Sequence, residues 1–199
     1  VVIKEDKVYR IGPGLVNFAG YARNRIDLFA VGRREIDKLA RETGEHANLA
    51  IFDGETGLLV YQSLGTNAVR QVSNIGEELP MHVTSLGKAI LSKLPEDKVD
   101  EILREQSHSP YIDQSQLDQD GLMTELTEIR DRGYATDTEE FMKGMRCVGA
   151  PITNLNDEVE GAVSVSGPTK RINGSEFNEK FPQKVLETAN IIEVNLSQL

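Results

Sequence analysis

The 199-residue sequence contains a single cysteine, Cys147, and no long run of apolar residues. One cysteine excludes an internal disulfide framework and fits a reducing cytoplasm. A membrane-spanning helix needs about 18 consecutive apolar residues, so no transmembrane segment is predicted. The first residues, Val1 to Asp6, lack the apolar core and cleavage site of a signal peptide, and they include no initiator methionine. We therefore expect a cytoplasmic protein that has no membrane partner and whose chain starts inside a longer one.

Basic residues are scarce. The sequence has 22 lysines and arginines against 32 aspartates and glutamates, which gives a net charge of −10. A surface this acidic repels phosphate backbones, so the chain as it stands is predicted to be a poor nucleic-acid binder. Solubility is the first interpretation of the acidity, and adaptation to high salt is the second. Neither interpretation bears on the fold.

Signatures of the common enzyme classes are also missing. The sequence has no GxGxxG after a predicted strand, no GxxxxGK[ST], no HExxH and no GxSxG nucleophile turn. The three histidines, His46, His82 and His108, are too far apart in the sequence to form a ligand pair by spacing. We therefore predict that the protein is not an enzyme and has no catalytic residues, no metal site and no cofactor.

The order of the predicted elements is typical of an α+β domain. Alternating apolar and polar residues predict short strands, and apolar stripes at helical spacing predict helices. One helix is expected to start with Asp27 as its N-cap and to end near Glu42, before Thr43 and Gly44. Hairpins favour an antiparallel sheet with helices on its faces. Predicted strands cover residues 1–10, 46–52, 58–64, 67–72, 134–138, 147–153 and 159–166. Predicted helices cover 15–25, 27–42, 85–94, a segment from Pro95, 116–132 and a terminal segment. Because Pro182 lies within the terminal helix, its first turns are expected to be bent or separate.

A signature near the C-terminus resembles a known family. Residues 133–152 read GYATDTEEFMKGMRCVGAPI, which closely resembles the pattern GYA-x-D-x-EE-x-x-x-G-x-RC-x-(A/G)-AP(I/V) of IclR-type transcription regulators. Three further segments agree in order and spacing: LARETGEHAN at 39–48, LPMHVTSLGKA at 79–89 and AVSVSGP at 162–168. Residues 9–13, YRIGP, resemble the exit from the family's DNA-binding wing. The resemblance covers nearly the whole chain.

This resemblance implies a GAF/PAS-like antiparallel sheet flanked by helices. It implies that residues 26–199 form an effector-binding and oligomerisation domain, that 11–25 form a linker and that 1–10 are a remnant of the DNA-binding wing. The rest of the winged helix-turn-helix domain is missing, so DNA would be contacted only through that absent part. The family acts in transcription regulation, often as repressors, and works as homodimers or tetramers that respond to a small organic acid.

The resemblance also implies an effector site. In the family the pocket is lined by the start of the TxxGKA helix, the aspartate of GYAxD, the cysteine of the signature and the two serines of SVS. On this chain the corresponding residues are Ser85, Leu86, Asp137, Cys147, Ser164 and Ser166.

The residues themselves support parts of this site. Thr84 can cap a helix whose first N–H groups favour an anion such as a carboxylate. Ser164 and Ser166 are two residues apart on a predicted strand, so both hydroxyls face one side. Asp137 repels a carboxylate unless it is protonated or bonds a ligand hydroxyl, and it could instead shape the pocket by holding a neighbouring N–H. Cys147 is interpreted as a small, polarisable wall of the pocket.

Other interpretations stay open at this point. A small enzyme could use Cys147 or a carboxylate pair of Asp137 and Glu139, and a ligand-free dimerisation module could keep the pocket only as core. A metal site of Cys147, His82 and Asp137 is conceivable, because all three residue types bind transition metals. The leading hypothesis is the ligand sensor.

Three smaller expectations concern the surroundings of the site. Arg146 is expected to pair with Glu139 or Glu140, and Tyr134 and Phe141 are expected to be core residues. The polar segment 106–119 is expected to be a lid or a surface loop.

Overall fold

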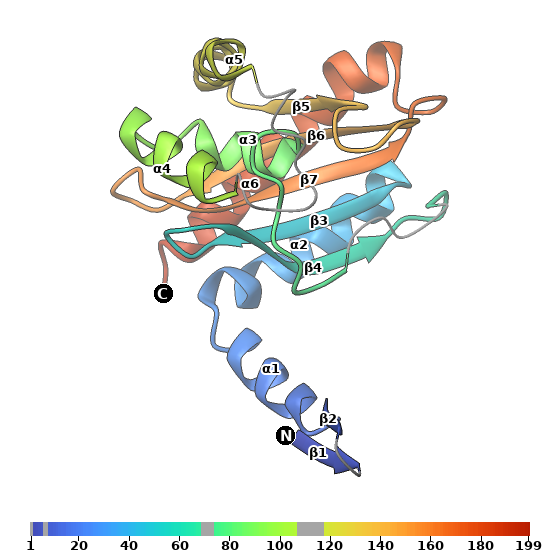
Figure 1. Cartoon of the computed structure of the whole chain (residues 1–199). Helices are drawn as coiled ribbons and strands as arrows, with labels where there is room; N and C mark the ends of the chain where they lie inside the picture. Colours follow the sequence, from blue (N-terminus) through green and yellow to red (C-terminus); the bar gives the residue numbers. More distant parts are fainter. Residues whose placement is uncertain (1, 6–7, 69–73, 107–117) are drawn as a thin grey trace.

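A computed structural model of the chain describes residues 2–5, 8–68, 74–106 and 118–199. Its centre is one five-stranded antiparallel sheet with helices on both faces (Figure 1). The strand order is β4-β3-β7-β6-β5. The predicted α+β class with a flanked antiparallel sheet is therefore confirmed. The strands are β3 His46–Phe52, β4 Gly57–Leu64, β5 Ala135–Thr138, β6 Met145–Thr153 and β7 Val159–Pro168.

One face of the sheet is covered by two long helices, α2 (Asp27–Thr43) and α6 (Phe181–Leu196). Their apolar stripes bury Ile36 and Ile192 against Leu49 and Val163 of the sheet. A short π-helix, η2 (Glu176–Lys180), precedes α6, so the turns before Pro182 form a separate element as predicted.

The start of α2 differs from the sequence-based expectation. Its N-cap is Ile26 in an extended conformation, without a side-chain cap, and Asp27 lies in the first turn. An acid there still faces the positive end of the helix dipole, although it does not cap the helix. The helix ends as predicted, because Gly44 takes a left-handed conformation with φ of 73°.

The other face carries three shorter helices, α3 (Ser85–Leu91), α4 (Glu96–Gln106) and α5 (Gln119–Arg132). Thr84 caps α3, since its Oγ1 accepts a hydrogen bond of 3.0 Å from the N–H of Gly87. Ile90 of α3 and Leu126 of α5 are buried in a second apolar cluster. Helix α3 contacts β6 and β7 directly, so its first turn lies against the middle of the sheet.

The N-terminal segment lies outside this layered body. Strands β1 (Val2–Glu5) and β2 (Val8–Ile11) form an antiparallel hairpin, and α1 (Leu15–Arg23) connects it to α2 (Figure 1). No residue of α1 is buried. The helix that the sequence predicts here is present, whereas the single strand predicted at 1–10 is divided into the two paired strands of this hairpin.

Some predictions cannot be compared with the structure. Most of the strand predicted at 67–72 lies outside the described residues, and Thr66 and Asn67 form a turn. Residues 107–117, which hold most of the polar segment predicted as a lid or loop, also lie outside them. Within the described ranges, no helix is both long and apolar enough to cross a membrane.

Candidate functional site

A cavity lies between the polar end of the sheet and the first turn of α3. All six residues that the sequence analysis placed in the site line it, from four separate elements of the chain. The cavity volume is about 50 Å³, roughly four times the space that a single water molecule needs. The lining residues are His46, Asn48, Leu59, Gln62, Leu79, Thr84, Ser85, Leu86, Asp137, Phe141, Met142, Met145, Cys147, Ser164 and Ser166.

The register of the sheet builds the floor of the cavity. In one row across the strands, Gln62 on β4 is opposite Asn48 on β3, and Asn48 is opposite Ser164 on β7. The Asn48 amide donates to both serine hydroxyls, at 3.1 Å to Ser164 Oγ and 3.2 Å to Ser166 Oγ. The Gln62 amide donates to Asn48 Oδ1 at 2.8 Å. Ser164 and Ser166 therefore share a face, as predicted, and form one hydrogen-bonded network with two residues that were not predicted.

A second row lies next to the first. Ser166 is opposite His46 on β3 and Cys147 on β6, and Cys147 is opposite Asp137 on β5. Residues far apart in the sequence thus become direct neighbours across the strands. Val163 and Val165 face the opposite side and are buried beneath α2 and α6.

Two glycines let α3 approach this floor. A Cβ on Gly149 would lie only 2.9 Å from the carbonyl oxygen of Ser85, and a Cβ on Gly87 would overlap the backbone of Met81. With no side chain at these positions, the first turn of α3 lies directly over β6. Thr84 accepts the N–H of Gly87, while the N–H groups of Ser85 and Leu86 have no acceptor within the helix itself.

Asp137 is the charged group of the cavity. Its side chain is 1% exposed, and this burial raises its pKa from 3.8 to about 6, although the N–H groups of Glu140 and Phe141 oppose the shift. Asp137 Oδ1 accepts from those two N–H groups at 2.9 and 3.4 Å. The carboxylate therefore holds the turn that follows β5, which is one of the two roles that the sequence left open.

The carboxylate pair of Asp137 and Glu139 does not form. Strand β5 ends at Thr138, and Glu139 has a left-handed φ of 72°, so the alternation of strand side chains stops before it. The Glu139 carboxylate instead accepts from the N–H of Gly144 at 2.7 Å. The prediction of a shared face is wrong because a turn replaces the strand at this residue.

Cys147 is a neutral thiol in this environment. Burial raises its pKa well above the ordinary range, and the negative charge of Asp137 raises it further. A thiol of this kind is a weak nucleophile, because the reactive species is the thiolate. Within the described part of the chain, no three His, Cys, Asp or Glu side chains lie close enough together to hold a metal ion.

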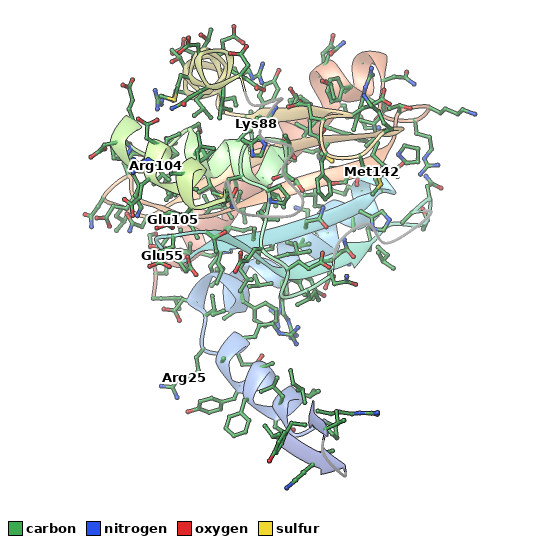
Figure 2. All side chains as sticks on the ribbon, in the orientation of Figure 1. Arg25, Glu55, Lys88, Arg104, Glu105 and Met142 are labelled. Atoms are coloured by element: carbon green, nitrogen blue, oxygen red, sulfur yellow. The ribbon has the colours of Figure 1, made fainter. Side chains whose placement is uncertain are left out.

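A buried lysine lies behind the cavity. Lys88 on α3 is fully buried, and its Nζ pairs with Glu125 of α5 at 2.8 Å and with Glu140 at 2.7 Å. Glu140 belongs to the same turn as Phe141 and Met142, which line the cavity. Figure 2 shows Lys88 on α3 in the middle of the molecule and Met142 in the turn after β5, toward the right of the view.

Two expectations about the surroundings are corrected. Arg146 does not pair with Glu139 or Glu140. Its guanidinium donates to the carbonyl of Ile172 at 3.4 Å and lies 5.1 Å from the centre of the Phe177 ring, because Arg146 faces the α6 side of β6. Phe141, expected in the core, lines the cavity. Tyr134 packs against the core as expected.

Comparison with known proteins identifies the family. Residues 21–194 match the family model described as "Bacterial transcriptional regulator IclR C-terminal". The chain belongs to the IclR family. The "Probable HTH-type transcriptional regulator ArcR" of Halobacterium salinarum is 37% identical over 194 residues, which is 96% of this chain and 74% of that protein. The "HTH-type transcriptional regulator XynR" of Escherichia coli is 31% identical over 182 residues, covering 90% and 72%.

Solved structures agree with the assignment. The Thermotoga maritima IclR crystal structure is 30% identical, with a TM-score of 0.83, and the match covers 98% of this chain and 79% of that one. The C-terminal domain of the E. coli regulator KdgR shares the fold, with a TM-score of 0.73 over 85% and 98% of the two chains. The chain is therefore the ligand-sensing, C-terminal part of an IclR-family transcription regulator, as its sequence signature predicts.

Proposed function

We propose that the cavity binds a small organic acid and that its occupancy modulates the binding of the full-length regulator to its operator. The observation that supports this most directly is the pair of serines, buried Ser164 and half-buried Ser166, which share one face of the cavity floor under the first turn of α3. Hydroxyl and N–H donors that converge on a small, partly open space suit a carboxylate.

The size of the cavity limits the ligand. A volume of about 50 Å³ holds roughly the equivalent of four water molecules. An acid with two or three carbon atoms fits this space, whereas an aromatic acid would extend beyond it. Glyoxylate and pyruvate are therefore the first compounds to test.

The domain roles belong to the same proposal. Residues 26–199 would sense the ligand and form a homodimer or tetramer, 11–25 would link them to the DNA-binding domain, and 1–10 would be the last part of its wing. The single cysteine favours a reducing cytoplasm as the working compartment. A ligand changes operator affinity only if it binds two arrangements of the oligomer with different affinity.

A thermal-shift screen tests the proposal. The panel contains glyoxylate, pyruvate, short dicarboxylates and aromatic acids, each tested on the wild type and on Ser164→Ala and Ser85→Ala variants. A ligand at 100 times its dissociation constant stabilises by about 2.7 kcal/mol, or roughly 5–10 °C in a domain of this size. We expect a shift with a two- or three-carbon acid that both variants lose. Ser63→Ala is the control, because Ser63 is on β4 and does not line the cavity.

Two results would contradict the proposal. If no acid shifts the wild type, the cavity is better explained as part of a ligand-free dimerisation module. If Ser164→Ala responds to the same acid as strongly as the wild type does, the ligand binds elsewhere.

A further inference from the structure

Asn48 has both ends of its side-chain amide occupied. Its Nδ2 donates to Ser164 Oγ at 3.1 Å and to Ser166 Oγ at 3.2 Å, so each of its two amide hydrogens has an acceptor. Its Oδ1 accepts from Gln62 Nε2 at 2.8 Å. The residue is 6% exposed and faces the cavity from the centre of the floor. In this arrangement the NH2 end of the Asn48 amide faces the serines and its oxygen faces Gln62.

This orientation determines what the serines can do. A hydroxyl has one hydrogen to donate and two lone pairs with which to accept. Ser164 and Ser166 each use a lone pair on Asn48, so each keeps its hydrogen for another partner. Ser166 also lies within hydrogen-bonding reach of the Cys147 thiol, but sulfur is a weak acceptor, and a ligand oxygen competes well with it. The floor of the cavity therefore presents hydroxyl donors to a ligand.

We propose that Asn48 is a specificity-determining, positioning residue: it makes Ser164 and Ser166 hydrogen-bond donors, and the site thereby selects a carboxylate over its neutral amide. This inference rests on the proposed function, because it concerns the same cavity. Gln62 supports it from the neighbouring strand by holding the Asn48 oxygen away from the serines.

The chemistry of the alternatives shows why an asparagine is needed. An aspartate at position 48 would have only acceptors, so the serines would donate to it and turn their lone pairs toward the cavity. A leucine would leave both hydroxyls free to rotate. A glutamate at position 62 could not donate to Asn48 Oδ1, so the Asn48 amide would reverse and present its oxygen to the serines.

The test uses two ligands that differ only in the group of interest, pyruvate and pyruvamide. Isothermal titration calorimetry gives the ratio of their dissociation constants for the full chain and for the Asn48→Leu, Asn48→Asp and Gln62→Glu variants. We expect the wild type to prefer pyruvate at least ten-fold, because the carboxylate offers an acceptor oxygen to each serine hydroxyl, whereas the amide offers one oxygen and an NH2 group that cannot accept. The ratio should fall by about ten-fold in Asn48→Asp and Gln62→Glu, and by about three- to ten-fold in Asn48→Leu.

Each variant has a separate purpose. Asn48→Leu is neutral, so a lower ratio there cannot come from repulsion between a new charge and pyruvate. Gln62→Glu leaves Asn48 in place, so it tests the orientation of the amide even if the Asn48 variants fold poorly. Ser63→Ala serves again as the control and should keep the wild-type ratio.

The outcomes separate this inference from the function on which it rests. If the wild type binds pyruvate with the expected preference but all three variants keep that ratio, Asn48 only joins the strands and the inference is wrong while the function stands. If the wild type binds both ligands equally, the donor polarity of the floor is also wrong. If the wild type binds neither ligand and no acid of the thermal-shift panel, the inference and the proposed acid-binding function fail together.

Discussion

The raised pKa of Asp137 makes the stability of the domain depend on pH in a direction opposite to that of most carboxylates. Burial raises this pKa from 3.8 to about 6, so the folded protein binds the proton more tightly than the unfolded chain. The stability that this proton contributes is fully present below pH 3.8 and is lost as the pH rises through about 6. Acidification should therefore stabilise the domain over this range.

The magnitude follows from the two pKa values. Their difference corresponds to about 3 kcal/mol in total, and about 1.4 kcal/mol of it is gained between roughly pH 7.5 and 5. Asp137→Asn removes the charge and keeps an oxygen that can accept from Glu140 and Phe141. We expect this variant to be more stable than the wild type at about pH 7.5, by up to about 3 kcal/mol, and the difference to shrink toward pH 5.

Urea unfolding followed by circular dichroism across this pH range is the assay. Asp131→Asn is the control, because Asp131 is exposed on α5, and its curve should run parallel to that of the wild type. The reasoning is refuted if the Asp137→Asn and wild-type curves are also parallel, or if the variant is clearly less stable near neutral pH. Because protonated Asp137 no longer repels an anion, acid binding should strengthen over the same range.

Three further predictions concern the structure around the cavity. Lys88→Met should lower the free energy of unfolding by about 2–3 kcal/mol. This is less than the loss expected for a fully buried ion pair, because the partner carboxylates keep some hydration. Lys93→Met is the control: it breaks an exposed ion pair and should lower the free energy of unfolding by about 0.5 kcal/mol. Gly87→Ala should lower the free energy of unfolding by about 1–3 kcal/mol and abolish acid binding, because the added Cβ overlaps the backbone of Met81. In Gly20→Ala on α1 the added Cβ contacts nothing, so this variant should be as stable as the wild type or slightly more stable. Alkylation of Cys147 should accelerate with every rise in pH up to about pH 9, without the low-pH plateau of a catalytic thiolate.

Much of the fold could be predicted because the apolar–polar alternation and the residues at helix ends indicate the same elements. Alternation of apolar and polar residues gave the bounds of β3 without error, and Thr84 and Gly44 marked helix ends where the structure has them. The spacing of Ser164 and Ser166 was enough to place both on one face. These features depend on residues that are neighbours in the sequence, so no knowledge of the tertiary structure was needed.

The missed parts depend on contacts between distant segments. Asn48 was visible in a motif of the family, but its role appears only when the register places it opposite Ser164, which is 116 residues away. The sequence tells which residues share a face of a strand, whereas the register between strands is fixed by the packing of the whole sheet. Glu139 was misplaced for a related reason, since its left-handed conformation is held by a hydrogen bond to Gly144 that alternation cannot predict.

The cavity lowers the stability of the domain in two ways: through its unpacked volume and through the burial of the Asp137 charge. A dry apolar cavity of about 50 Å³ would cost about 1 kcal/mol by comparison with cavities in other protein cores, and a polar, partly open one costs less. Keeping Asp137 ionised near neutral pH costs about 3 kcal/mol. The larger cost is therefore electrostatic, and filling the space with an apolar group would recover the smaller part only.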